Sequence, residues 1–130
     1  MKILIVEDDF ASRYLMQTIL KKYGPCDVAT NGIEAVMMFN MSISEGDKYD
    51  LICLDINMPE MDGKETLKQI RYIESQNGIE GLDGTKIIMT TAYGDSENVI
   101  FSFTNQCDAY LIKPIVAEKL HDIITDLCIE

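Results

Sequence analysis

The chain has 130 residues, of which 47% are hydrophobic and 25% charged, and this fits one globular domain over residues 1–130. No apolar run approaches the roughly 18 residues that a membrane-spanning helix needs, and the amino-terminal MKILIVEDD turns acidic too early for a signal peptide. We therefore expect a cytoplasmic protein. The net charge of -11 disfavours binding to nucleic acids and to anionic membranes.

The cysteines do not form a pattern typical of metal or redox chemistry. The four of them are far apart in the sequence, without a CxxC pair, and the chain has a single histidine. This spacing predicts neither a zinc site nor a redox dithiol. We expect reduced cysteines with packing roles.

The first half of the chain alternates apolar runs with helical patterns. KILIV at 2–6 predicts a strand, and the apolar spacing within 11–23 predicts a helix. A short strand at 26–29 leads into a helix at 31–43 that opens with Asn and Gly. KYDLICLD at 48–55 predicts a third strand, which ends on an aspartate.

The second half repeats this alternation. KETLKQIRYIES at 64–75 predicts a helix with its apolar residues on one side. Strands are predicted at 85–91 and 109–114, with a shorter helix at 96–105 between them. The closing segment at 115–128 carries an apolar stripe at helical spacing.

Five alternations of this kind predict an α/β fold with a doubly wound, five-stranded parallel sheet. The strands are too continuously apolar to have one face in water, so helices should cover both faces of the sheet. One common strand order for such folds is 2-1-3-4-5, and their ligands bind where the carboxyl ends of the strands meet. Functional residues are therefore expected in the loops that follow the strands.

Residues that follow four of the five strands have the chemistry of a phosphoryl site. The first and third strands are neighbours in this order, so the acids that follow them should converge. Clustered carboxylates repel one another unless a cation neutralises them, and Mg²⁺ prefers such oxygen ligands. A lysine and a threonine hydroxyl suit the oxygens of a phosphoryl group. The residues are Glu7, Asp8, Asp55, Asn57, Thr91 and Lys113.

Each of these residues alone has a simpler interpretation. The acids of EDD at 7–9 are as easily explained as caps of the following helix. An isolated Asp55 before a proline-containing loop is typical of a turn, and Gly63 fits turn chemistry in either case. We favour a functional site because all the simpler explanations would have to coincide at one edge of the sheet.

Four motifs together resemble the receiver domain of two-component response regulators. They are VEDD at 6–9, LDINMPEMDG at 54–63, TTA at 90–92 and YLIKP at 110–114, in family order and with family spacing. The likeness covers essentially the whole chain. It implies that Asp55 accepts a phosphoryl group from a sensor histidine kinase or a phosphotransfer protein.

The resemblance also implies roles for the neighbouring residues. Asp8, Asp55 and the backbone carbonyl of Asn57 would hold Mg²⁺, and Glu7 would reach the ion through a bound water. Such a domain catalyses its own phosphorylation and dephosphorylation. Three further residues are implied to respond to the phosphoryl group. Thr91 would be the switch hydroxyl, Lys113 the counter-charge of the phosphoryl group, and Tyr110 the aromatic residue whose rotamer changes with the switch. The bond between Lys113 and Pro114 is expected to be cis.

Signal output would pass to a downstream protein through the helix at 96–105, the strand at 109–114 and the last helix. Several features depart from the family or remain open. Asn57 and Tyr93 occupy positions that tune how long the phosphoryl group survives. Phe101 and Phe103 fall where many receivers have small residues, and the role of the long loop Ser75–Gly84 is not predicted.

Two other classes of protein share parts of this pattern. A Mg²⁺-dependent phosphohydrolase would usually have a second aspartate two residues after its nucleophile, but here that residue is Asn57. A flavodoxin-like electron carrier would need a first loop that cradles phosphate, whereas EDDFAS is acidic. The complete set of site residues argues against a receiver-like adaptor that is never phosphorylated. Whether the chain is a stand-alone receiver or one domain of a longer protein stays open.

Overall fold

The computed structural model describes residues 1–58, 60–92 and 106–127 of the chain. Four α-helices and two short 3-10 helices, η1 (Lys21–Tyr23) and η2 (Gly81–Asp83), lie within these residues. The strands are β1 (Ile3–Val6), β2 (Cys26–Ala29), β3 (Leu51–Asp55), β4 (Lys86–Thr91) and β5 (Ala109–Ile112), and the α-helices are α1 (Phe10–Leu20), α2 (Gly32–Ser44), α3 (Gly63–Gln76) and α5 (Ala117–Asp126). The helix predicted at 96–105, with Phe101 and Phe103, lies outside the described residues, as do Pro59, Tyr93 and Cys128.

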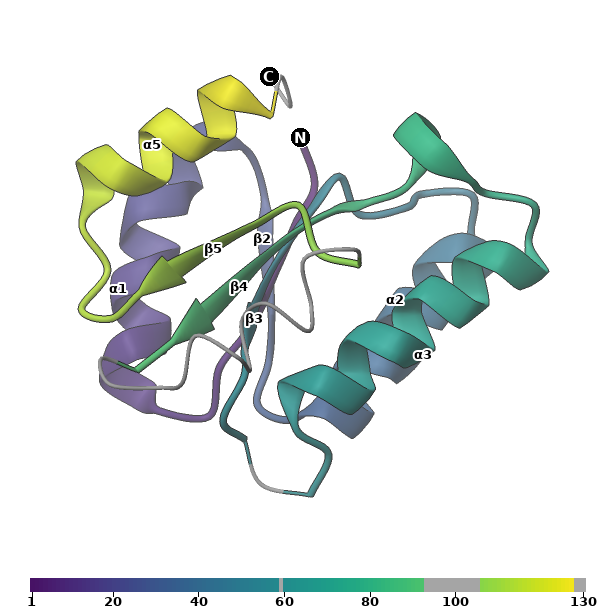
Figure 1. Ribbon diagram of the computed structural model, residues 1–130, viewed down its shortest axis with the longest axis horizontal. Coiled ribbons are helices and arrows are strands. Elements are labelled where there is room, and N and C mark those ends of the chain that lie inside the picture. Colours follow the sequence, from purple (N-terminus) through teal and green to yellow (C-terminus); the bar gives the residue numbers. More distant parts are fainter. Residues whose placement is uncertain (59, 93–105, 128–130) are drawn as a thin grey trace.

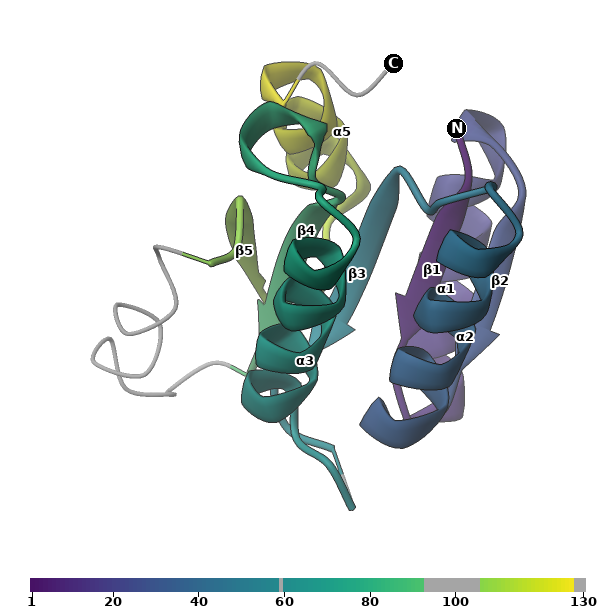
Figure 2. The ribbon, with the colours of Figure 1, turned by 90° about the vertical axis from the view of Figure 1, so that its right-hand side faces the viewer.

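The strands form one parallel sheet in the order β2-β1-β3-β4-β5, which confirms the predicted fold class and strand order. All five strands point the same way, so their carboxyl ends lie at one edge of the sheet (Figures 1 and 2). The loops after β1, β3, β4 and β5 therefore begin at this edge.

Helices cover both faces of the sheet. In Figure 1, α1 and α5 lie on one side, and α2 and α3 lie on the other. Each face has its own core, since the side chains of a strand alternate between the two faces. One cluster joins Ile3 and Ile5 to Leu20 of α1 and Leu120 of α5, and the other contains Leu4 and Val6. In the described part of the chain, no helix is long and apolar enough to cross a membrane.

Several element boundaries differ from the predicted ones for local reasons. The first helix begins at Phe10, because the Asp9 carboxylate accepts a hydrogen bond from the Ser12 amide at 2.9 Å and so caps it. Its last predicted turn is the 3-10 helix η1. The third strand begins only at Leu51, and just before it the Asp50 side chain accepts a hydrogen bond from the Lys2 amide at 2.7 Å.

A half-buried arginine, Arg71, joins the segments at the amino ends of β4 and β5. The Arg71 guanidinium donates to the nearly buried Glu74 carboxylate at 2.7 Å and to the Thr85 carbonyl at 2.9 Å. It also donates to the Gln106 carbonyl at 2.8 Å and pairs with Asp108 at 3.2 Å. These contacts join α3 to the chain segments that lead into β4 and β5. They thus help to place the two strands, whose carboxyl ends lie at the other edge of the sheet.

Gly63 allows α3 to start directly against the backbone of β3. A Cβ atom at this position would lie 2.4 Å from the Asp55 carbonyl oxygen and 2.6 Å from the Ile56 Cα. The Gly63 amide donates to the Ile56 carbonyl at 2.9 Å. The requirement for glycine here is close packing, so our sequence-based interpretation of Gly63 as turn chemistry was wrong.

We expect Gly63→Ala to destabilise the fold, although alanine normally favours a helix. Because backbone atoms cannot yield easily, the added methyl group should cost ~1–3 kcal/mol as overpacking and shift Asp55. Urea unfolding measures the loss. Ser75→Ala, at an exposed position of α3, is the control and should change the free energy of unfolding by less than ~0.5 kcal/mol. A Gly63→Ala variant as stable as the parent would contradict this account.

Candidate functional site

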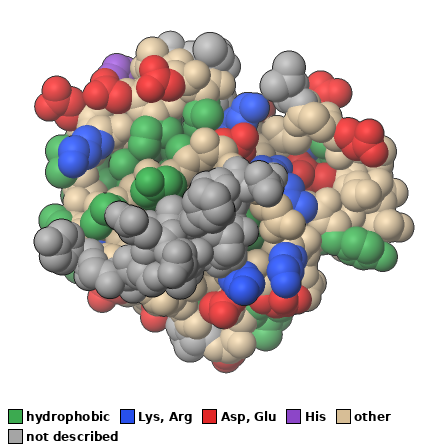
Figure 3. Space-filling model, viewed as in Figure 1, with side chains coloured by type: hydrophobic (Ala, Val, Ile, Leu, Met, Phe, Trp, Pro, Cys, Tyr) green, Lys and Arg blue, Asp and Glu red, His purple; other side chains and the backbone are tan. Residues whose placement is uncertain are grey.

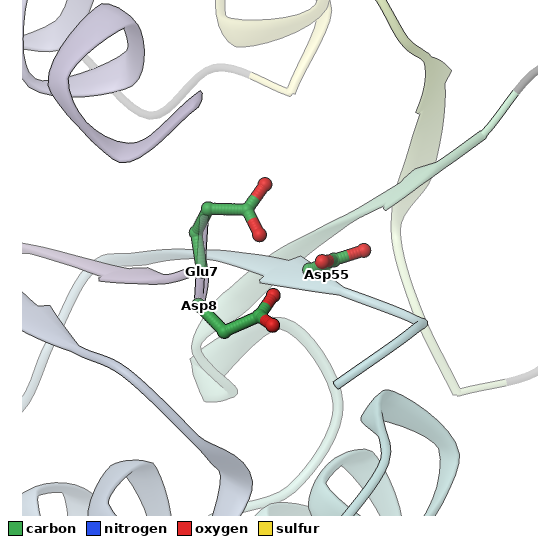
Figure 4. Close-up of side chains that lie close together, drawn as sticks. All are labelled: Glu7, Asp8 and Asp55. Atoms are coloured by element: carbon green, nitrogen blue, oxygen red, sulfur yellow. The ribbon is translucent and has the colours of Figure 1, made fainter. Parts of the chain in front are cut away.

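Three carboxylates meet at the carboxyl ends of β1 and β3. The register of these strands pairs Val6 with Leu54, so the next residues, Glu7 and Asp55, lie side by side at the edge of the sheet. Asp8 follows on the same loop. One oxygen from each of Glu7, Asp8 and Asp55 lies within 4.8 Å of the others, and Figure 4 shows the three side chains converging.

Two of these acids are buried although they have like charges. Glu7 and Asp55 are each only 3% exposed, whereas Asp8 is exposed to solvent. Lys113 supplies a counter-charge from the loop after β5. Its Nζ atom lies 2.5 Å from Glu7 Oε1 and 3.3 Å from Asp55 Oδ2. Burial of this pair of acids therefore depends on a lysine more than 50 residues away in the sequence.

The pKa values at the site reflect burial and charge. Burial raises the pKa of Glu7 above its ordinary value, and a hydrogen bond with Asp55 raises it further, while Lys113 has the opposite effect. Burial alone would lower the pKa of Lys113. The hydrogen bond to Glu7 and the charges of Asp55 and Glu7 outweigh burial, so that the pKa of Lys113 is raised.

The trio EDD divides between two roles. Asp9 is the cap of α1, and the hydrogen bonds from Ser12 lower the pKa of its carboxyl group. Glu7 and Asp8 instead belong to the acid cluster. Taken alone, the EDD motif left capping and site formation open, whereas the joint pattern predicted Glu7 and Asp8 as the site residues; in the structure Asp9 is the cap and the other two lie in the cluster.

The other predicted site residues differ in their relation to the cluster. The Asn57 amide donates to Asp55 Oδ1 at 3.2 Å. Thr91 is fully buried at the end of β4, and its carbonyl accepts a hydrogen bond of 2.7 Å from the Lys113 amide, just before the cis bond to Pro114. Tyr110 lies on β5 with its side chain 46% exposed. The structure thus brings Lys113 to the acids, and Tyr110 to the surface.

We predict that the buried Glu7 makes stability depend on pH. Because its pKa is higher in the folded chain than the ordinary value of 4.5, the folded chain holds more protons than the unfolded chain above that pH. The contribution of Glu7 to the free energy of unfolding should therefore fall as pH rises from about 4.5 towards neutrality. Glu7→Gln should remove this fall.

Urea unfolding in a chelating buffer across this pH range measures the effect. The exposed Glu118→Gln variant controls for the loss of one negative charge from an acidic chain. If the stability difference between the parent and Glu7→Gln stays constant across the range, the interpretation of Glu7 is wrong.

Solved structures with the same fold include several receiver domains. The receiver domain of the histidine kinase CKI1 from Arabidopsis thaliana, complexed with Mg²⁺ and BeF₃⁻, is 26% identical, with a TM-score of 0.82 over 99% of this chain and 90% of that one. A CheY-like response regulator receiver domain protein from Methanospirillum hungatei is 28% identical, with a TM-score of 0.73 over 96% of this chain and 90% of that one.

Sequence relatives are much longer than this chain. It is 32% identical over 129 residues to the sensory/regulatory protein RpfC of Xanthomonas campestris, covering 99% of this chain and 17% of that protein. It is 30% identical over 129 residues to the osmosensing histidine protein kinase SLN1 of Saccharomyces cerevisiae, covering 98% of this chain and 10% of that protein. The family model of the response regulator receiver domain matches residues 3–125. The chain belongs to the response regulator receiver domain family.

Proposed function

We propose that the chain is a phosphoryl-accepting receiver, with residues 1–130 as one domain and Asp55 as the phosphoacceptor. The observation that carries the proposal is the convergence of Glu7, Asp8 and Asp55, with Lys113 bound to two of them. The phosphodonor is a sensor histidine kinase or a phosphotransfer protein, and the relatives that are named histidine kinases support this choice. The chain acts as a signalling module that catalyses its own phosphorylation and dephosphorylation.

The acid cluster fits Mg²⁺ by its chemistry. All its side-chain donors are carboxylate oxygens within 4.8 Å of one another, and hard cations prefer such ligands. Asp8, Asp55 and the Asn57 carbonyl would hold the ion, and Glu7 would reach it through a water. When bound, Mg²⁺ would neutralise charge on the transferring phosphoryl oxygens. The solved structure of a related receiver domain with Mg²⁺ and BeF₃⁻ supports this assignment.

Asp55 acts as the nucleophile. One of its carboxylate oxygens forms the new bond to phosphorus, while the bond between phosphorus and the donor histidine nitrogen breaks and leaves its electron pair on the imidazole. Lys113 already lies 3.3 Å from Asp55 Oδ2, so its ammonium group can bind an oxygen of the incoming phosphoryl group without a large movement. Positioning and charge neutralisation provide most of the rate enhancement.

The signal leaves through the surface next to β5. The new dianionic group attracts the Thr91 hydroxyl and Lys113, and Tyr110 moves inward from its exposed position. An exposed apolar patch consists of Tyr110, Ile112 and Val116, each between 46% and 50% exposed. Figure 3 shows hydrophobic side chains gathered on this side of the molecule, beside α5. Together with the helix predicted at 96–105, this patch would bind a downstream protein.

The net charge of -11 supports a receiver that contacts proteins and not nucleic acid, and we propose that it acts in the cytoplasm.

Asp55→Asn should abolish phosphorylation. With a labelled small phosphodonor and Mg²⁺, we expect the parent to take up close to one equivalent of label and the variant to take up none, because the amide is not a nucleophile. A chelator should abolish uptake by the parent. Asp122→Asn, an exposed change on α5, is the control and should label like the parent. Equal labelling of Asp55→Asn would refute the proposal, and turnover far above one equivalent would instead favour a phosphohydrolase.

A further inference from the structure

We propose that Arg13 is a positioning residue that orients the loop carrying Glu7 and Asp8, and that it thereby increases the affinity of the site for Mg²⁺. This inference rests on the proposed function, since it concerns the same metal site. Nothing in the sequence motifs singles out Arg13, which lies on α1, one turn away from the acids.

The contacts of Arg13 cross the loop between β1 and α1. Its Nη1 atom donates to the Glu7 carbonyl at 3.1 Å and to the Asp8 carbonyl at 3.3 Å. Its backbone amide donates to the Asp9 carbonyl at 2.9 Å. The amide bond is the first backbone bond of α1, whereas the two guanidinium bonds are specific to the Arg13 side chain and fix the peptide planes that carry Glu7 and Asp8.

An aromatic ring restricts the guanidinium in turn. The Arg13 guanidinium carbon lies 5.5 Å from the centroid of the Phe10 ring, and Phe10 stacks on Tyr14 with their centroids 6.3 Å apart. Phe10 is 71% exposed, so it contributes little to the core. Contact with the guanidinium face gives this exposed ring a role, because it limits the conformations of Arg13 to those that reach the loop.

Of the three acids, Asp8 depends most on an ordered backbone for the direction of its side chain. Glu7 and Asp55 are held by burial and by Lys113, whereas the Asp8 side chain is exposed. The direction of a short, exposed carboxylate follows from the backbone that carries it. Groups that orient metal ligands commonly change metal affinity by about 10- to 100-fold when they are removed.

A charge effect and a positioning effect of Arg13 would change Mg²⁺ binding in opposite directions when the guanidinium is removed. A guanidinium close to the acids repels Mg²⁺, so its removal would tighten binding if charge were the main effect. If positioning is the main effect, its removal weakens binding. Lysine keeps the charge but loses the planar guanidinium, whose Nη1 atom donates to both carbonyls and whose face contacts the Phe10 ring. Arg13→Met and Arg13→Lys therefore separate the two effects.

Calorimetric titration of the full chain with MgCl₂ tests the inference. We expect Arg13→Met and Arg13→Lys each to weaken Mg²⁺ binding by about tenfold. Phe10→Ala should weaken it by a smaller factor and also tests the inference if an Arg13 variant fails to fold. Lys21→Met, which removes one exposed positive charge at the other end of α1, is the control and should bind Mg²⁺ like the parent.

A second measurement distinguishes positioning from general damage to the fold. In phosphorylation by a small phosphodonor, the Mg²⁺ concentration for half-maximal rate should rise in the Arg13 variants, while the rate at saturating Mg²⁺ stays within about twofold of the parent. If Arg13→Met binds Mg²⁺ as tightly as the parent or more tightly, the inference about Arg13 is wrong and the proposed function is unaffected. Failure of the parent to bind Mg²⁺ would instead overturn the proposed function.

Discussion

Two carboxylates buried side by side are the constraint on which the rest of the structure depends. Like charges in a poorly solvated place repel strongly, and the raised pKa of Glu7 reflects the cost of keeping this side chain ionised beside Asp55. Lys113 makes the arrangement tolerable, because its ammonium group lies within 3.3 Å of an oxygen of each acid. A site that is electrostatically costly when empty is well suited to bind a cation, since a bound cation relieves the repulsion.

The fold holds these charges in place largely by fixing the backbone segments that carry them. Adjacent parallel strands place Glu7 next to Asp55, and the Thr91 carbonyl holds the Lys113 amide. Gly63 lets α3 pack directly on the Asp55 carbonyl, so the backbone of Asp55 lies between β3 and the start of α3. The proposed role of Arg13 extends the same principle to the loop of Asp8. In a preorganised site of this kind, the acids and Lys113 would need little rearrangement to accept the proposed phosphoryl group.

Sequence patterns were most informative where one physical signal dominates. Continuous apolar runs identified the five strands, and the residues just after them identified the acids and Lys113. Patterns were less informative where two chemistries use the same residue type. An aspartate after a strand suits a helix cap and a metal site equally well, and only the hydrogen bond from Ser12 separates Asp9 from Asp8. Likewise, Gly63 resembles a turn glycine until the distance to the Asp55 carbonyl is known.

The order of strands and helices, the family motifs and the expected convergence of Glu7, Asp8 and Asp55 could be predicted from the sequence, because hydrophobic periodicity and motif spacing are local properties of the chain. The folded chain was needed to show that Asp9 caps α1, that Lys113 pairs with both Glu7 and Asp55, and that Arg13 contacts the loop of the acids. These contacts join residues from different elements. Their distances depend on how the strands and helices pack, and a linear pattern does not record packing.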